Sequence, residues 1–420
     1  MTPEHPSADA DRAPVVALLG TLDTKGAEYA WLRERLAEAG CAVVLVDAGV
    51  RPPAGAVPDI DRAAVAAAAG ADVERLGAAG DRGAAVAAMA EGAASVLTEL
   101  HGRGRLDAVL AVGGSGGSAI AARAVRELPI GLPKLIVSTM ASGDVAPYVG
   151  AKDVAIMYSV VDIAGVNRVS RLVLGNAVAA VAGMARAHAA PRPAAGEDRP
   201  LVAASMFGVT TPAVESARAR LEELGYEVLV FHATGAGGRA LESLAASGLL
   251  HGVLDLTTTE LADELVGGVL SAGPDRLTAA GRAGLPQVVA PGALDMVNFG
   301  PRGTVPEPFA GRLLYVHNPT VTLMRTTAAE MAELGRLAGA KLRAATGPTS
   351  VFWPRRGVSA LDADGQPFQD RAADDACFAA LSEELAGSPV ELVPLDLHIN
   401  DQRFAAAMAD RLHALIGAER

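Results

Sequence analysis

The chain has 420 residues, of which half are hydrophobic and 4% are aromatic, and its formal net charge is −12. This length suits two domains with separate cores. The acidic charge and the scarcity of aromatic rings argue against a nucleic-acid partner, which needs a basic surface and stacking platforms, but they leave room for a small anion bound locally by backbone amides.

The N-terminal residues 1–13 are acidic and contain proline, without the apolar stretch of a signal peptide, so we expect a disordered tail. No segment approaches the roughly 18 consecutive apolar residues of a membrane span. Cys41 and Cys377 lack the spacing of metal ligands, and we expect two reduced thiols. These features together predict a cytoplasmic protein with no membrane partner.

The first half of the chain alternates short aliphatic runs with helical segments. Strands are predicted at residues 15–19, 42–46, 108–112 and 134–138, and the stretch 51–104 is expected to be helical with a proline-rich entry. This alternation is typical of an α/β domain, a mostly parallel sheet with helices on both faces. We assign this domain to residues 14–190, followed by a proline-rich linker at 191–200.

The second half, residues 201–420, repeats the alternation and predicts a second α/β domain. Its strands are expected at residues 228–231, 252–256, 287–290, 313–316, 349–353 and 390–395. The polar loop at 362–370 lacks the ligand spacing of an EF-hand, and we predict no metal site there.

Four segments of the first half recur in the second half in the same order. Residues 17–47 match 204–232, 106–114 match 251–258, 131–144 match 284–297, and 157–170 match 313–327, which places Arg168 opposite Arg325. Such self-similarity predicts two related Rossmann-like domains.

The turn after the first predicted strand has the composition of a phosphate site. It contains Gly20, Thr21, Asp23, Thr24 and Lys25 and opens a helix. A helix start offers free N–H groups, and a lysine adds a point charge. The order of these residues is not that of a Walker A loop, and Asp23 or Thr24 could instead cap the helix.

Asp47, at the end of the second predicted strand, occupies a position where an acid often meets a ribose hydroxyl. A turn or cap role is the alternative.

The turn after the third strand is rich in glycine: Gly113, Gly114, Ser115, Gly116 and Gly117. Glycines strip side chains from the turn and let backbone amides surround an anion. The same letters match the nucleophile elbow of acyl hydrolases. Because no histidine lies between Ser115 and His188, we regard Ser115 first as an anion contact and only second as a nucleophile.

The turn after the fourth strand supplies further hydroxyls and an acid. Asp144 is a candidate ligand for a Mg²⁺ ion that accompanies phosphates, with a capping role as the alternative. The candidate ligand residues of this turn are Ser138, Thr139, Met140, Ser142, Gly143 and Asp144.

Polar residues of the second half are candidates for binding a second, small acidic substrate, since arginines beside hydroxyl-rich turns suit a carboxylate or phosphate. The alternative is a domain that lost its ligand and kept polar turns. The candidates are His232, Thr258, Glu260, Arg302, His317 and Arg325.

Six motifs together resemble the family of Tm-1-like ATP-binding proteins, and the resemblance covers the chain beyond its N-terminal tail. The motifs are GTLDTKG, GGSGGS, STMASGD, FHATGAGG, PGALDMVNFG and HNPTVTLMRTT. The resemblance implies ATP on a Rossmann-like first domain, a second Rossmann-like domain, and a homodimer, and a Mg²⁺ ion could accompany the ATP phosphates.

We therefore expect an ATP-binding protein, with two interpretations of its role. The first is an ATP-dependent enzyme that acts on a small carboxylate or sugar acid, and the second is a nucleotide-binding regulatory or scaffold protein without turnover. A hydrolase that uses Ser115 is a third and weaker alternative. No catalytic residue is assigned.

Overall fold

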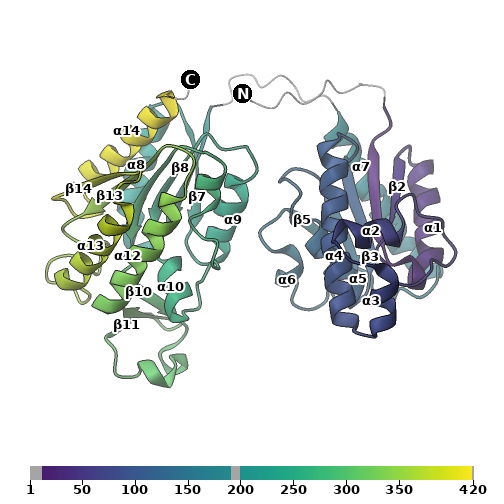
Figure 1. Ribbon diagram of the computed structural model, residues 1–420, viewed down its shortest axis with the longest axis horizontal. Helices are drawn as coiled ribbons and strands as arrows, with labels where there is room; N and C mark the ends of the chain where they lie inside the picture. Colours follow the sequence, from purple (N-terminus) through teal and green to yellow (C-terminus); the bar gives the residue numbers. More distant parts are fainter. Residues whose placement is uncertain (1–11, 191–198, 419–420) are drawn as a thin grey trace. The chain divides into compact units, whose positions relative to one another are not determined.

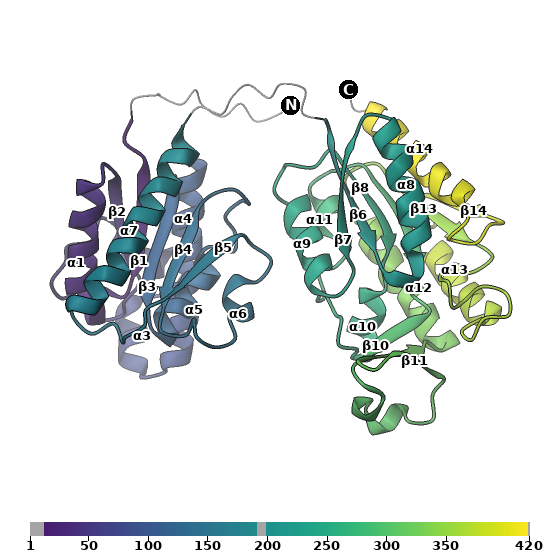
Figure 2. The ribbon, with the colours of Figure 1, turned by 180° about the vertical axis from the view of Figure 1, so that it is seen from behind.

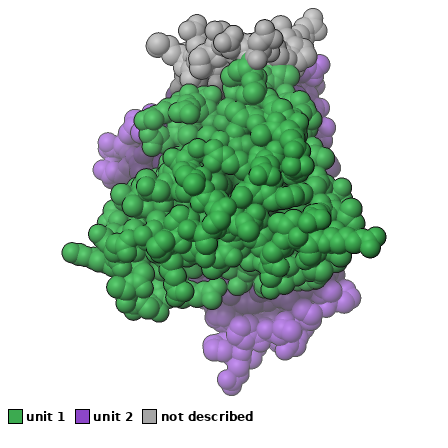
Figure 3. All heavy atoms as spheres, turned by 90° about the vertical axis from the view of Figure 1, so that its right-hand side faces the viewer, with its two compact units in different colours: residues 1–196 green, residues 197–420 purple. Residues whose placement is uncertain are grey.

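The computed structural model describes residues 12–190 and 199–418. The chain divides into two compact units, residues 1–196 and 197–420, coloured separately in Figure 3. Most of the expected tail at 1–13 and of the expected linker at 191–200 lies outside the described residues. Arg12, which the sequence places in the tail, forms a two-pronged ion pair with the buried Asp107 at 2.7 and 2.9 Å.

Unit 1 contains one five-stranded parallel sheet in the order β2-β1-β3-β4-β5. The predicted strands are present and extend by at most one residue beyond their expected ends. The fifth strand, an edge strand, was not expected from the sequence. The strands are β1 (Val15–Gly20), β2 (Ala42–Asp47), β3 (Ala108–Gly113), β4 (Lys134–Ser138) and β5 (Val154–Tyr158).

Helices cover both faces of this sheet because alternate strand residues supply two separate cores. Leu18 and Leu110 pack with α1 and α7, and Leu19 and Ala111 pack with α2, α4 and α5. Figure 1 shows α2, α4 and α5 in front of the sheet. Figure 2, the view from behind, shows α1 and α7 on the opposite face. The helices of unit 1 are α1 (Leu22–Glu38), α2 (Arg62–Ala68), α3 (Val73–Ala79), α4 (Arg82–Gly102), α5 (Ser115–Ala124), α6 (Ala146–Val149) and α7 (Arg168–Ala189).

Helix α7 is, among the described helices, the one long and apolar enough to cross a membrane by length and composition. Its buried residues, such as Leu174, Val178 and Val181, pack against α1 and the sheet. This packing is that of a core helix.

Unit 2 contains a six-stranded parallel sheet in the order β14-β13-β9-β8-β6-β7. Counted from β6, this is the strand order of unit 1 with one strand added at the edge. The prediction of two related α/β domains is thereby confirmed. The strands are β6 (Leu201–Met206), β7 (Glu227–His232), β8 (Gly252–Thr257), β9 (Gln287–Gly292), β13 (Thr349–Pro354) and β14 (Glu391–Leu395).

One core of unit 2 lies between this sheet and α8 and α14, and another lies between it and α10, α12 and α13. The two groups of helices appear on opposite sides in Figures 1 and 2. The helices are α8 (Thr211–Glu223), α9 (Ala236–Ala245), α10 (Glu260–Val266), α11 (Ala279–Arg282), α12 (Ala328–Arg343), α13 (Arg371–Leu385) and α14 (Gln402–Ala418), with short 3₁₀ turns at Gly208–Thr210, Arg302–Thr304 and Glu307–Phe309.

The strand expected at 313–316 does not belong to the parallel sheet. It forms β11 (Leu314–Asn318) in a separate antiparallel sheet with β12 (Val321–Arg325) and β10 (Met296–Phe299). The side chain of Asn318 accepts the N–H of Thr320 at 2.9 Å, and this tight turn reverses the chain at once. The fourth repeated segment is therefore not equivalent in the two units, since Arg168 begins α7 whereas Arg325 ends β12.

The strand order of unit 1 reverses direction between β1 and β3. In open parallel sheets, ligands bind at the carboxyl ends of the strands beside such a switch point. The two glycine-containing turns after β1 and β3 both lie there.

Candidate functional site

A pocket of about 520 Å³ lies at the switch point of unit 1. The turns after β1, β2 and β3 form part of its wall, and α3, α4 and α5 complete it. Its lining residues are Thr21, Asp23, Thr24, Lys25, Ala48, Gly49, Val50, Arg51, Leu76, Gly77, Gly80, Asp81, Arg82, Ala85, Val86, Met89, Gly114, Ser115, Gly116, Gly117 and Ile120.

The N-terminus of α5 provides a cluster of free backbone donors in this pocket. Gly114 is extended (φ −81°, ψ −160°), and the first helical bond runs from the N–H of Ser118 to the carbonyl of Gly114 at 2.9 Å. Within the described residues, the N–H groups of Ser115, Gly116 and Gly117 donate to no acceptor. Three adjacent free N–H groups at the positive end of a helix form a site for an anion.

Glycine at position 113 allows a close approach between β3 and α5. A Cβ at Gly113 would lie 3.0 Å from the Cα of Gly117, so the helix start lies directly against the end of β3. The sequence expectation that this turn exposes its backbone is consistent with this geometry.

The turn after β1 presents Thr21 and Lys25 to the same pocket. The Thr21 and Thr24 hydroxyls lie 3.0 Å apart, and Lys25 has non-helical angles (φ −133°, ψ 23°) that break α1 near its start. The ammonium of Lys25 donates to the carbonyl of Ile163 at 2.5 Å. Since an ammonium has three donors, this bond orients Lys25 and leaves further N–H groups for a ligand.

Gly20 does not line the pocket. A glycine is needed at this position because the ring of Tyr29 packs against it. A Cβ there would lie 1.9 Å from the ring of Tyr29. The buried Tyr29 hydroxyl lies 2.6 Å from the carbonyl of Leu19 and accepts the N–H of Val112 at 2.9 Å. Tyr29 thus satisfies backbone groups where β1 and β3 separate.

The two predicted acids of this region differ in position. Asp23 lines the pocket and accepts the N–H of Arg51 at 3.2 Å. Asp47 is fully buried and does not line the pocket; it accepts the N–H groups of Leu22 at 3.1 Å and Gly49 at 2.8 Å. Burial raises the pKa of Asp47, and its position ties β2 to the turn after β1.

The third predicted turn lies outside the pocket lining. Ser138 is buried, bonds the Ser118 hydroxyl at 2.6 Å and accepts the N–H of Met140 at 3.0 Å. Asp144 accepts the N–H of Ala146 at 3.0 Å, at the start of α6. All candidates of this turn lie outside the lining, namely Ser138, Thr139, Met140, Ser142, Gly143 and Asp144, and so does Gly113 of the preceding turn.

Two arginines of the pocket were missed from the sequence. Arg51 follows β2, and Arg82 begins α4, within a stretch that the sequence predicted only as helical. The sequence feature that could have indicated Arg82 is the Gly80-Asp81-Arg82 turn, which separates two helices. Gly80 has φ +70° and ends α3, and Asp81 accepts the N–H of Ala84 at 3.0 Å as the N-cap of α4.

In unit 2, Glu260 is buried in an ion-pair cluster instead of facing a pocket. Its carboxylate accepts N–H groups of Gly235 and Gly238 at 2.7 and 3.0 Å and pairs with the fully buried Arg276 at 2.6 Å. Arg276 also pairs with Asp255 at 2.5 and 2.7 Å. Glu260 therefore serves as an internal anion for the start of α9.

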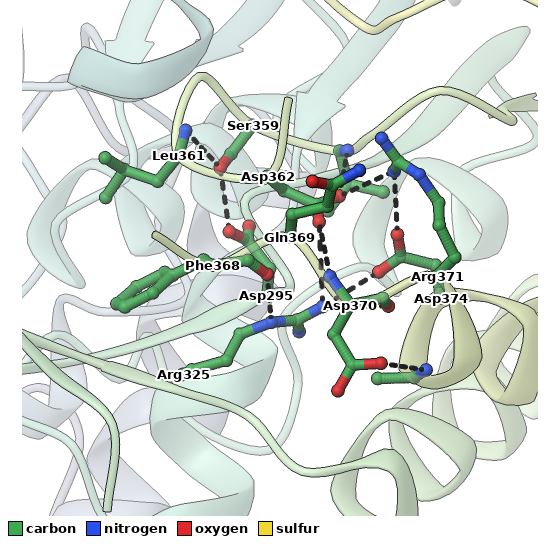
Figure 4. Close-up of polar contacts among 12 residues, drawn as sticks. Asp295, Arg325, Ser359, Leu361, Asp362, Phe368, Gln369, Asp370, Arg371 and Asp374 are labelled. Carbon is green, nitrogen blue, oxygen red and sulfur yellow. Dashed lines mark hydrogen bonds and ion pairs between the residues drawn. The ribbon is translucent and has the colours of Figure 1, made fainter. Parts of the chain in front are cut away.

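Arg325 is likewise buried, in a network drawn in Figure 4. Its guanidinium donates to the carbonyl of Phe368 at 2.7 Å and to Asp374 at 3.0 Å, and it lies 3.7 Å from Asp362. The loop at 362–370 thus closes over Arg325.

Asp295 belongs to the same network through the Ser359 hydroxyl, which donates to one carboxyl oxygen at 2.7 Å. The other oxygen has no partner within the described residues. Burial raises the pKa of Asp295 to about 6 and that of Asp374 to about 7.

The remaining candidates of unit 2 are dispersed. Thr258 is buried and donates to the carbonyl of Ala290 at 3.2 Å, whereas His232, Arg302 and His317 are exposed on different elements. Within the described residues, no hydrogen bond or ion pair joins any two of the six candidates. The structure does not bring them together as one substrate site.

In the part of the chain that the structure describes, no group of three or more His, Cys, Asp or Glu side chains is placed to hold a metal ion.

Models of the two domains of the uncharacterised protein family UPF0261 match residues 14–190 and 199–416. A UPF0261 protein of Clostridium tetani is 50% identical over 397 residues, which are 94% of this chain and 98% of that protein. The ToMV resistance protein Tm-1(GCR237) of Solanum lycopersicum is 44% identical over 332 residues, 78% of this chain but only 44% of the tomato protein.

Among solved structures, a putative UDP-N-acetylglucosamine 2-epimerase from Listeria monocytogenes is 12% identical with a TM-score of 0.24, over 91% of this chain and 100% of that one. This similarity is too weak to bear on function.

Proposed function

We propose that this chain, which belongs to the uncharacterised protein family UPF0261, binds a nucleotide in the pocket of unit 1. The free N–H groups of Ser115, Gly116 and Gly117 carry the proposal, since they offer several donors to one phosphate. Lys25 adds a positive charge at the same pocket. ATP is the first candidate, because the sequence motifs resemble those of Tm-1-like ATP-binding proteins.

The size and composition of the pocket favour a nucleotide over a bare phosphate ion. A volume of about 520 Å³ is within the usual range for small-molecule sites. Besides the polar turns, the lining includes Leu76, Val86, Met89 and Ile120. These side chains give the base or ribose an apolar surface.

A Mg²⁺ ion bound to ATP needs only one or two protein carboxylates. Of the three acids among the candidate residues of unit 1, Asp23 lines the pocket, whereas Asp47 and Asp144 do not. We therefore assign the contact with hydrated Mg²⁺ to Asp23.

The pocket supports binding more directly than catalysis. None of its lining residues is a histidine, and within the described residues no hydrogen bond joins Ser115 to a histidine. An activated serine requires such a base. The Ser115 hydrolase is therefore the least favoured of the three functions.

The test removes one amide donor without disturbing the helix. Ser115 is the first residue of α5, a position that accepts proline, and Gly114 already has the extended conformation that precedes proline. Ser115→Pro deletes the N–H and the hydroxyl, whereas Ser115→Ala deletes the hydroxyl alone. A hydrogen bond to a charged group is worth about 1.5–3 kcal/mol, so Ser115→Pro should weaken ATP binding about 10- to 100-fold in isothermal titration calorimetry.

Ser115→Ala should retain affinity within a few-fold of the wild type. Equal affinity of Ser115→Pro and wild type would remove α5 from the site. Release of ADP from ATP in the presence of small carboxylic acids would favour the enzyme interpretation, and binding without release would favour the regulatory one.

A further inference from the structure

The side chain of Arg82 lies close to Gly116, in the first turn of α5. A Cβ built on Gly116 would come within 3.4 Å of Nη2 of Arg82. Glycine at position 116 therefore leaves room for the guanidinium next to the helix start. Arg82 reaches this position from the first residue of α4, a different segment of the chain.

The side chain of Arg82 is exposed and has no hydrogen bond or ion pair in the part of the chain that the structure describes, although the whole chain has 48 acidic residues against 36 basic ones. The adjacent Asp81 caps α4. By contrast, Arg123 on α5 pairs with both Glu91 and Glu127 at 2.6 and 2.9 Å.

The position of Arg82 is unfavourable in the absence of a ligand. A cation near a helix N-terminus opposes the helix dipole, and Arg82 lies at the N-terminus of α4 and beside that of α5. Lys25 and Arg51 line the same pocket, so that with Arg82 three cationic side chains face the two lining acids, Asp23 and Asp81. An anion with several charges would offset this excess of positive charge.

We propose that Arg82 binds a phosphate beyond the one held by the α5 amides, so that the pocket selects nucleoside di- and triphosphates over monophosphates. This inference rests on the proposed nucleotide site. It adds the residue that distinguishes nucleotides by the number of their phosphates. A guanidinium suits this role because it donates two parallel bonds to a phosphate.

The experiment compares ATP, ADP and AMP by isothermal titration calorimetry on the wild type, Arg82→Gln and Arg75→Gln. Arg75 is the matched control, because it is exposed on the neighbouring α3 and does not line the pocket. Arg82→Gln should weaken ATP about 10- to 100-fold and AMP less than about 3-fold. Arg75→Gln should change neither.

The ligand-free protein gives a second readout that a merely structural arginine would not produce. Loss of the Arg82 cation should raise the melting temperature of Arg82→Gln by roughly 1–2 °C. A lower melting temperature would contradict the electrostatic argument.

Equal weakening of ATP and AMP, or no change in either, would overturn the assignment of Arg82 while the nucleotide site stands. Absence of binding of all three nucleotides to the wild type would overturn both.

Discussion

Asp295 is a buried carboxyl whose protonation depends on the ion-pair network around it. Within the described residues, its network contains two further buried acids, Asp362 and Asp374, and two arginines, Arg325 and Arg371. Three buried carboxyls facing two guanidiniums favour retention of a proton. The pKa values of Asp295 and Asp374, raised by burial to about 6 and about 7, agree with this count.

The raised pKa predicts that stability falls as pH rises. An unfolded aspartate releases its proton near pH 4, whereas folded Asp295 keeps it to about pH 6. The folded state binds more protons between these values, so this contribution is present at pH 4 and is lost as pH rises through 6. In the wild type, this effect should lower the free energy of unfolding by at most about 3 kcal/mol between about pH 4.5 and 7.5. In Asp295→Asn, the free energy of unfolding should decrease less over the same pH range.

Urea unfolding of unit 2 can be followed through Trp353 in a Trp31→Phe background, because the chain has only these two tryptophans. The exposed Asp375 on α13 offers the control Asp375→Asn, which should keep the wild-type pH dependence. If Asp295→Asn also shows the wild-type pH dependence of stability, Asp295 does not hold the proton.

Single residues were predictable from the sequence where a local pattern determines them. Thr21, Asp23, Thr24, Lys25 and the residues 114–117 do line one pocket. Glu260 and Arg325 could not be recognised as structural, because their partners Arg276 and Asp374 are distant in the chain. The pairing depends on tertiary contacts that the sequence pattern does not contain.

At the scale of elements, the loop after β2 packs directly against α1 because Gly26 has no side chain. A Cβ at Gly26 would lie 1.6 Å from the carbonyl oxygen of Ala54. The N–H of Ala54 in turn donates to the carbonyl of Leu22 at 3.0 Å. The same loop carries Arg51 to the pocket.

Gly26→Ala should therefore destabilise unit 1 by about 1–3 kcal/mol and weaken ATP binding, because the backbone has to move. Gly183 on α7 provides the matched control, since a Cβ added there would meet nothing within 4 Å. Gly183→Ala should stabilise the helix by about 0.5–1 kcal/mol and leave ATP affinity unchanged. Differential scanning calorimetry and titration measure the two effects; a Gly26→Ala protein with wild-type values would refute this view of the loop.

Strands were predictable where burial on both faces produces a continuous aliphatic run, as in β3 and β4. The edge strand β5 is only partly buried and was missed, and β11 was placed in the wrong sheet because hairpin pairing looks similar to a buried strand in the sequence. The break in α1 at Lys25 was also not predictable.

At the scale of the whole molecule, two units with the same strand order differ in what their switch points hold. In unit 2 the turn after β8, which corresponds to the glycine turn after β3, runs from Thr257 at the end of the strand to Glu260 at the start of α10, and all four residues are buried. Glu260 and Arg276 satisfy each other there. The internal repeat therefore predicted the common fold, but the buried ion pair at the switch point of the second copy became visible only in the structure.

Both proposals require that a nucleotide binds at the switch point of unit 1 and not at that of unit 2. Hydrogen–deuterium exchange of the full chain, with and without ATP and Mg²⁺, examines both switch points at once, because the free amides of α5 should become bonded. We predict slower exchange in peptides that cover residues 21–26, 80–86 and 113–118, and no change over 257–262. Unchanged exchange in the first three segments at saturating ATP, or slowing confined to 257–262, would contradict a nucleotide site in unit 1.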